Sequence, residues 1–434
     1  MKKLVLLLTA LCMALTSVAA LADNMGNDVE WRAQLSDAGK GLYVEGLSEE
    51  EIAALTETTI IKDENSPTGY TVTFRHYAPD ATRVRIRGEW SFYQPVRSTK
   101  FLTGAYDPEE WVDGMFPLQV DIADWPAYDM QKNEETGVWF YTIPLPSGTW
   151  SYRFYEGGAE GAELTDYTDA VAYTDVNNLP FEKELGEQGN SQVRVPFDAE
   201  KQTLDLSVQL ARTDGQVGVT EVLTYEAPGV ENLKDDPAIA VYLPYGYDAE
   251  REEPYKVLYI SHGAGSESET SWYNKGSLAF ITDNLIADGV IEPMVVVIIN
   301  NYSVGFNYDS FIADVVPLVE STYNVATDPA NKAVCGLSAG SGFTRNVMLN
   351  YTDAFDNYGN FSMGSAAEYP ASLANKGLYL GTGFYDFAYS GVVDMMKSYD
   401  ELGFEYGSLI INGGHDWNLW RQLYVDYVSN YLWK

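Results

Sequence analysis

The sequence contains little cysteine and histidine, with two cysteines and three histidines among 434 residues. Cys12 lies in an apolar N-terminal run that we expect to be removed, so Cys335 would stand alone in the mature chain without an intramolecular disulfide. Three scattered histidines and one cysteine offer no cluster of metal ligands at a recognisable spacing. We therefore predict no metal site and no cofactor, and we expect the hydrophobic core to supply the stability.

Basic residues are also scarce, because 27 lysines and arginines stand against 63 aspartates and glutamates, which gives a formal net charge of −36. Such a protein repels polyanions, so we expect no nucleic-acid partner, no anionic membrane surface and no acidic polysaccharide. A neutral small ester or esterified polysaccharide meets no long-range barrier. The composition indicates no particular oligomeric state.

Long apolar runs are missing from the sequence after its first 22 residues. Lys2 and Lys3 precede an apolar run at 4–19, and the small-residue pattern Ala20-Leu21-Ala22 follows it. This order is typical of a secretory signal peptide, and we predict cleavage after about Ala22, secretion, and no membrane association afterwards. The alternative is an uncleaved anchor helix, since the run is nearly long enough to span a bilayer.

The length favours two domains after the signal peptide. Residues 23–58 form a lead-in with one helical pattern at 48–55. Short alternating runs separated by Gly, Pro and Asn or Asp then predict an all-β, immunoglobulin-like sandwich over 59–197, with 91–133 as an elaborated loop inside it. Its strands are expected at 70–78, 82–90, 137–145 and 149–157.

A polar junction over 198–214 leads to a region, 215–434, in which apolar strands alternate with helical patterns. This alternation predicts a mostly parallel, doubly wound sheet with helices on both faces, as in α/β-hydrolases. The expected strands are 238–247, 255–263, 294–301, 332–337, 377–383 and 407–413. The expected helices lie near 276–288, 309–323, 340–350, 391–402 and 418–434.

A G-x-S-x-G sequence, Gly336-Leu337-Ser338-Ala339-Gly340, stands between an apolar strand and a helical pattern. This strand, turn and helix are what a nucleophile elbow requires, with glycines where side chains would collide with neighbouring elements. We predict that Ser338 is a nucleophile and that the Ala339 amide binds an oxyanion. The alternative is an ordinary turn that contains Gly and Ser.

A serine nucleophile needs a base, and α/β-hydrolases place an acid and then a histidine after the serine. His415 is the only histidine beyond Ser338, and it follows the last expected strand. Asp386 follows the preceding strand, so we predict that it orients His415. Asp394 and Asp400 are competitors inside a helical pattern, and Asp416 is expected to support the loop.

A second oxyanion donor should follow an early strand. His262-Gly263-Ala264-Gly265 does so, and we predict the Ala264 amide, with Gly263 as the alternative. His262 is expected to have a structural role.

These motifs resemble the esterase D-like branch of α/β-hydrolases, which includes feruloyl, acetylxylan and enterochelin esterases and mycolyl transferases. The matching stretches are AVYLPYGYD at 240–248, HGAGSESETSW at 262–272, PMVVVIIN at 293–300, GLSAG at 336–340 and GGHDWNLW at 413–420. Trp272, Asn300 and Trp417 lie in these stretches and are candidate substrate contacts. The family usually has Met and Gly where this chain has Ala339 and Ser341. The β-rich region before it looks like the immunoglobulin-like, glycogen-binding-like module that often precedes such esterases.

The resemblance implies a secreted serine esterase that releases feruloyl or acetyl groups from plant cell-wall xylan. A catecholate siderophore esterase of the enterochelin type is the alternative enzyme. A glycan-binding protein with a retired hydrolase domain is the alternative of another class.

Overall fold

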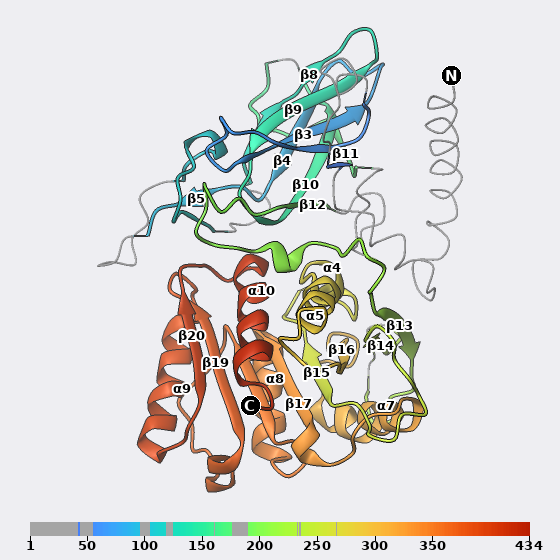
Figure 1. The fold of residues 1–434 in the computed structure, drawn as a ribbon, viewed down its shortest axis with the longest axis vertical. Coiled ribbons are helices and arrows are strands. Elements are labelled where there is room, and N and C mark those ends of the chain that lie inside the picture. Colours follow the sequence, from blue (N-terminus) through green and yellow to red (C-terminus); the bar gives the residue numbers. More distant parts are fainter. Residues whose placement is uncertain are drawn as a thin grey trace.

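The computed structural model describes residues 42–43, 55–95, 105–118, 125–159, 161–175, 190–231, 233, 236–265 and 267–434. The predicted signal peptide and all but the last residue of the helical pattern at 48–55 lie outside these ranges. The described chain forms a β-rich front part and a larger α/β part, stacked along the long axis of the molecule (Figure 1). No helix within the described ranges combines the length and apolar character needed to cross a bilayer.

The front part contains two main sheets, and nearly all of their strand pairs are antiparallel. The first has the order β1 (Leu42–Tyr43), β2 (Thr59–Lys62), β3 (Tyr70–Tyr77), β9 (Val138–Pro144) and β8 (Gln131–Lys132). The second has the order β11 (Ala170–Tyr173), β10 (Gly148–Gly157), β4 (Val84–Gly88) and β7 (Ala127–Asp129). Strand β12 (Ser191–Val195) also pairs with β10.

The two sheets share one hydrophobic core. Phe74 of β3 packs against Tyr152 of β10 with ring centroids 4.6 Å apart, and both side chains are fully buried. Each such aromatic ring contributes roughly 2–3 kcal/mol through removal of apolar surface from water. This arrangement is compatible with the predicted sandwich, while the specific immunoglobulin-like topology stays a prediction.

The prediction that 91–133 forms a loop is wrong for the residues described there. Strand β8 belongs to the first main sheet and strand β7 to the second. Strands β5 (Phe92–Tyr93) and β6 (Phe116–Pro117) form a small sheet of their own. Trp111 is 4% exposed and belongs to the module core. Strands of two or three residues give no readable alternation in a sequence, so composition suggested a loop.

The α/β part contains an eight-stranded sheet in which β14 runs antiparallel to its neighbours and the remaining pairs are parallel. The strand order is β13 (Val219–Thr224), β14 (Ala238–Leu243), β16 (Val295–Ile299), β15 (Val257–Ser261), β17 (Lys332–Leu337), β18 (Asn357–Phe361), β19 (Gly377–Gly383) and β20 (Gly407–Ile411). Strand β18 was not predicted, because NYGNF is polar for a strand at the centre of a sheet.

Helices cover both faces of this sheet (Figure 1). One face carries α6 (Tyr308–Ser310), a π-helical turn (311–315), α7 (Val316–Thr322), α8 (Ala339–Asn350) and α9 (Tyr389–Leu402). The other carries α4 (Ser271–Asn274), α5 (Leu278–Ala287), α10 (Trp417–Asp426) and a π-helical turn (427–431). Neighbouring strand residues alternate between the two cores, since Val297 faces the first set and Ile298 the second.

Pro317 explains the π-helical turn inside the helix that was predicted over 309–323. Proline has no N–H to donate, and its ring clashes with the carbonyl four residues earlier. The widened turn at 311–315 directly before α7 relieves that clash.

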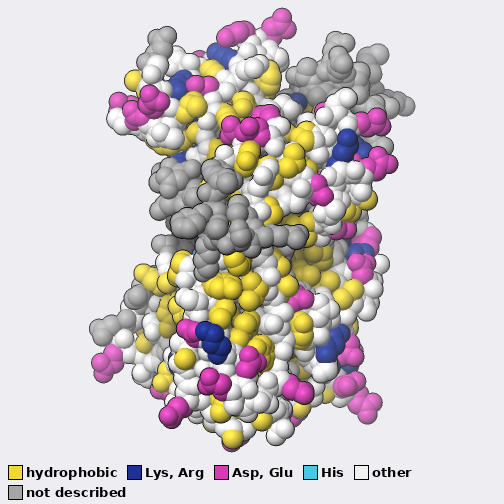
Figure 2. Space-filling model, turned by 90° about the vertical axis from the view of Figure 1, so that its left-hand side faces the viewer, with side chains coloured by type: hydrophobic (Ala, Val, Ile, Leu, Met, Phe, Trp, Pro, Cys, Tyr) yellow, Lys and Arg dark blue, Asp and Glu magenta, His cyan; other side chains and the backbone are white. Residues whose placement is uncertain are grey.

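The surface in Figure 2 carries acidic side chains over both parts of the chain, with only scattered basic ones. This distribution agrees with the formal net charge of −36.

Candidate active site

Ser338 stands at the sharp turn between β17 and α8. Its φ of 51° and ψ of −121° are strained for a residue other than glycine, and the surrounding elements hold it there. The turn is so tight that a Cβ on Gly336 would lie 2.5 Å from the Gly340 carbonyl oxygen. A Cβ on Gly340 would lie 2.3 Å from the His262 carbonyl oxygen. Both glycines are therefore needed for the elbow to form.

The three predicted catalytic residues meet at the carboxyl ends of β17, β19 and β20. His415 Nε2 lies 2.9 Å from Ser338 Oγ, and His415 Nδ1 lies 2.9 Å from Asp386 Oδ1. Asp386 is 2% exposed. A buried carboxylate at this place fixes the imidazole with a proton on Nδ1, which leaves Nε2 free to accept the serine proton.

The competing carboxylates lie elsewhere. Asp394 pairs with Lys397 on the exposed side of α9, and Asp400 accepts a hydrogen bond from Tyr406. Asp416 is buried and caps α10 by accepting from the Leu419 amide at 3.0 Å. It thus supports the loop that carries His415, as the sequence suggested.

The loop after β15 lies beside the nucleophile. A Cβ on Gly263 would lie 3.3 Å from Ser338 Cβ and 3.8 Å from Ser338 Oγ, so this backbone borders the place where a tetrahedral oxyanion would form. The N-terminus of α8 begins at Ala339, directly after the nucleophile. Its positive dipole end and free amides favour negative charge at the same place.

His262 holds this loop and has no free nitrogen for catalysis. Its side chain is fully buried, Nδ1–H donates to the Gly263 carbonyl at 2.7 Å, and Nε2 accepts from the Asn301 amide at 3.1 Å. Burial lowers the pKa of His262, so the ring is neutral and the two bonds define its tautomer. The structure thus agrees with the structural role expected for this histidine.

The three candidate substrate contacts are buried, and a direct contact with substrate stays a prediction for them. Trp272 is fully buried and donates its indole N–H to the Ser261 carbonyl at 2.9 Å. Asn300 is 6% exposed and donates to Glu269. Trp417 is 6% exposed and packs edge-on against Trp272. Their polar groups and rings are already engaged with other residues of the α/β part.

Sequence reasoning missed an aromatic residue that covers the base. The Phe387 ring lies 4.1 Å from the His415 ring, centroid to centroid, although Phe387 is 75% exposed. Trp420 meets the same imidazole edge-on at 5.0 Å and donates to Ser362 Oγ. The only sequence signal was the position of Phe387 directly after the predicted acid.

The front part also reaches this site. Phe116 of β6 stacks on Tyr385, the residue before Asp386, with centroids 5.1 Å apart. A Cβ on Gly414 would lie 2.4 Å from Leu118 Cδ1, so the loop before His415 touches the front part directly. The loop that carries Asp386 and the loop that carries His415 therefore both contact residues of the 91–133 segment.

Glu89 and Arg421 are two buried ionisable residues, one from each part of the chain, whose charges interact. Glu89 of the front part accepts from the Ser151 amide at 2.8 Å, and burial raises its pKa to about 7 although the charge of Arg421 opposes the shift. Arg421 of α10 is 1% exposed, and burial lowers its pKa.

Within the described residues, no group of three or more His, Cys, Asp or Glu is placed to hold a metal ion.

Comparison with known proteins gives a family match over part of the chain and a shared fold. Residues 230–372 match the family model Esterase, described as "Putative esterase". The chain is 32% identical over 212 residues to an endo-1,4-beta-xylanase/feruloyl esterase of Xylanibacter ruminicola, which covers 45% of this chain and 29% of the relative. It is 32% identical over 130 residues to endo-1,4-beta-xylanase Y of Acetivibrio thermocellus, covering 27% of this chain and 12% of the relative.

The chain thus spans less than a third of the length of these curated relatives.

A solved structure of an enterobactin esterase from Shigella flexneri, determined in the presence of enterobactin, is similar over 90% of this chain and 99% of that chain. The TM-score is 0.55 and the identity is 15%, so this likeness concerns the fold, over both parts of the chain. Residues 230–372, within the α/β part of the chain, thus resemble the esterase family, and the fold is shared with a solved esterase over both parts.

Proposed function

We propose that the chain is a serine esterase that works through a covalent acyl-enzyme. The observation that carries this proposal is the hydrogen-bonded relay from Ser338 through His415 to the buried Asp386, with 2.9 Å at each step. An unassisted serine hydroxyl is a weak nucleophile, and a base within hydrogen-bond reach removes that limitation.

In the first half of the reaction, His415 Nε2 accepts the proton of Ser338 Oγ as this oxygen attacks the ester carbonyl. The imidazolium that forms is stabilised by Asp386, and it then gives the proton to the leaving alcohol. The acyl group remains on Ser338 as an ester. In the second half, His415 takes a proton from water, the resulting hydroxide attacks the acyl carbon, and the proton returns to Ser338 as the acid leaves.

The negative oxygen of both tetrahedral intermediates needs fixed donors. We assign this role to the Ala339 and Ala264 amides, with Gly263 as the alternative to Ala264. The position of Gly263 beside Ser338 and the start of α8 at Ala339 support this assignment. Such donors lower the barrier by about 3–4 kcal/mol each when they are aligned in advance.

For the substrate, we infer a feruloyl or acetyl ester on plant cell-wall xylan, cleaved by a secreted enzyme. The name of the Xylanibacter ruminicola relative pairs xylanase with feruloyl esterase and supports this choice. The sequence pattern of a signal peptide and the strongly acidic composition, which favours neutral polymers over polyanions, point the same way.

The test compares hydrolysis of methyl ferulate, acetylated xylan and enterochelin at equal enzyme concentration. We expect kcat/KM to be highest for a feruloyl or acetyl ester. Activity confined to enterochelin would establish the alternative, a catecholate siderophore esterase. The shared fold with the Shigella flexneri enterobactin esterase favours that alternative as second choice.

The remaining alternative is a glycan-binding protein whose hydrolase domain has lost its activity. The hydrogen-bonded relay argues against it, since each of the three side chains is present and in contact. A fluorophosphonate probe reacts only with an activated serine. Stoichiometric labelling of the native chain and no labelling of Ser338→Ala would exclude the inactive alternative.

A further inference from the structure

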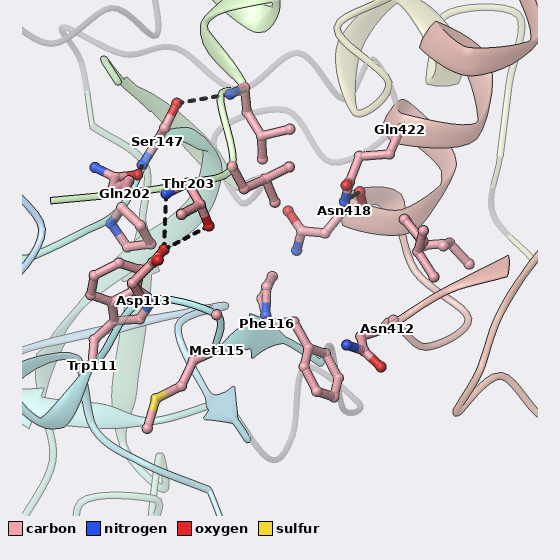
Figure 3. A pocket seen from close by; sticks show the side chains of 18 of the residues that line it. Trp111, Asp113, Met115, Phe116, Ser147, Gln202, Thr203, Asn412, Asn418 and Gln422 are labelled. Carbon is pink, nitrogen blue, oxygen red and sulfur yellow. Dashed lines mark hydrogen bonds between the residues drawn. The ribbon is translucent and has the colours of Figure 1, made fainter. Parts of the chain in front are cut away.

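A cavity of about 230 Å³ lies between the front part and α10, apart from the catalytic serine. Its wall combines residues from the front part, the junction and the hydrolase, including the Asn412–Gly413 stretch that leads to His415. Figure 3 shows Trp111 on one side of the hollow and Asn418 of α10 on another, with Phe116 and Asn412 along its lower edge. For scale, a cavity of about 150 Å³ holds benzene, so this one admits a molecule as large as a sugar ring.

Two buried donors on its wall have no partner among the described residues. Asn418 is 8% exposed, its Nδ2 makes no hydrogen bond, and its Oδ1 accepts from Arg421 at 2.9 Å. The indole N–H of Trp111, which is 4% exposed, also makes none. Figure 3 shows the Asn418 amide directed into the hollow. A buried donor without a partner costs about 1–3 kcal/mol, so an acceptor in the cavity that reached the Asn418 amide would offset this cost.

The wall chemistry narrows the class of ligand. Trp111, Trp150 and Phe116 supply apolar faces, and the amides of Asn412 and Gln422 supply further donors and acceptors. Flat apolar faces with a few placed polar groups suit a ring that has hydroxyls on its edge and C–H groups on its face.

Charge excludes acids from this cavity. Asp113 is the one charged side chain among the described lining residues, and it already accepts from the Thr203 amide and hydroxyl. An anionic ligand, such as a free phenolic acid, would meet this carboxylate with no cation to balance it. A neutral ligand meets no such penalty.

We propose that this cavity binds one ring of a neutral sugar, through the Trp111 and Asn418 donors. This binding site is separate from Ser338, and sugar binding there does not depend on esterase activity. Because the cavity and His415 share the 411–415 loop, a glycan chain held here by one ring lies close to the catalytic loop.

The experiment measures binding of xylobiose, maltose and cellobiose to the full Ser338→Ala chain by isothermal titration calorimetry. This background separates the proposal from the esterase function, since nothing is hydrolysed. We expect one saturable site for at least one of the three sugars. Trp111→Phe keeps an aromatic ring but removes the N–H, and we expect binding to weaken about threefold to tenfold.

Trp90→Phe is the matched control. Trp90 is a fully buried tryptophan of the same module core, its indole N–H is also unpartnered within the described chain, and it does not line the cavity. Binding by this variant should equal that of the parent. Leu204 lines the cavity and is 51% exposed, so Leu204→Trp fills the mouth without disturbing the core and should abolish binding.

Three results would overturn the proposal. The first is the absence of saturable binding for all three sugars. The second is equal binding by the parent, Trp111→Phe and Leu204→Trp, which would put the sugar elsewhere. The third is saturable binding of sodium ferulate that Leu204→Trp abolishes while the sugars do not bind, which would assign the cavity to an aromatic acid.

Discussion

Arg421 of helix α10 donates a hydrogen bond from Nη1 to the Thr149 carbonyl of strand β10 at 3.2 Å, across the boundary between the two parts of the chain. Its Nε donates to the Lys275 carbonyl at 2.8 Å. One buried guanidinium thus joins the front part to the α/β part, six residues after His415. The front part is therefore held against the helix that follows the His415 loop.

Replacement of this residue tests how strongly the two parts depend on each other. Arg421→Met leaves the Thr149 and Lys275 carbonyls without their donor, so we expect the free energy of unfolding to fall by roughly 3 kcal/mol. We also expect faster tryptic cleavage at Lys201 and Arg212 in the junction. Arg345→Met is the control, because Arg345 is half-buried within the hydrolase alone. Equal cleavage rates for both variants would contradict the bridging role.

The nucleophile is tested by Ser338→Ala. Loss of the attacking oxygen should lower kcat by several powers of ten, because the acyl-enzyme cannot form. The melting temperature should not fall, since the strained backbone at φ 51° loses no packing. Ser398→Ala, on the exposed side of α9, serves as the control and should keep full turnover. Near-normal kcat in Ser338→Ala would refute the assignment.

The choice of Asp386 over Asp394 is tested by two amide substitutions. Asp386→Asn replaces the carboxylate that accepts the hydrogen bond from His415 Nδ1–H, and we expect kcat to drop by about a thousandfold to ten-thousandfold. Asp394→Asn removes only a pair with Lys397 at the surface, so kcat should stay within about twofold. Comparable losses in both variants would mean that the orienting acid is misassigned.

The buried Glu89 makes stability depend on pH. Its folded-state pKa of about 7 lies above the ordinary value of 4.5, so the folded chain retains a proton that the unfolded chain has lost between these values. The stabilisation from this group is complete below pH 4.5 and is lost as the pH rises through 7.

Glu89→Gln removes this titration while it keeps an oxygen for the Ser151 amide. Between pH 5 and 8 we expect the native chain to lose up to about 3 kcal/mol of unfolding free energy more than the variant does. Urea denaturation at several pH values measures the difference. Parallel pH profiles for the two proteins would show that Glu89 does not titrate in this range.

The aromatic cover over the base is tested by Phe387→Ala. The ring is 75% exposed, so its removal should leave the melting temperature unchanged, but its centroid lies 4.1 Å from that of the His415 imidazole, the proposed acid for the leaving alcohol. We expect kcat/KM to fall roughly tenfold for a feruloylated oligosaccharide and much less for methyl ferulate, because only the bulky alcohol reaches this face. An equal loss of kcat/KM for both esters would mean that Phe387 contacts the acyl group and not the alcohol.

The order of the catalytic residues was predictable from the sequence for a physical reason. Apolar strands followed by helical patterns specify a mostly parallel sheet, and all parallel strands expose their carboxyl ends on one edge. Ser338, Asp386 and His415 each follow such a strand, so the topology brings them together whatever the details of packing. The π-helical turn before Pro317 and the strands β13 and β18 are local features that this pattern did not reveal.

The surroundings of the site depended on tertiary structure. Trp272, Asn300 and Trp417 lie in the same motif stretches as the predicted site residues, yet tertiary contacts bury all three side chains. Phe387, Glu89, Arg421 and the cavity beside Asn418 gain their roles from contacts between distant segments. The sequence by itself determined the fold class and the order of Ser338, Asp386 and His415. Only the three-dimensional packing decided that the front part touches the catalytic loops, because side-chain contacts across two domains leave no periodic signal along the chain.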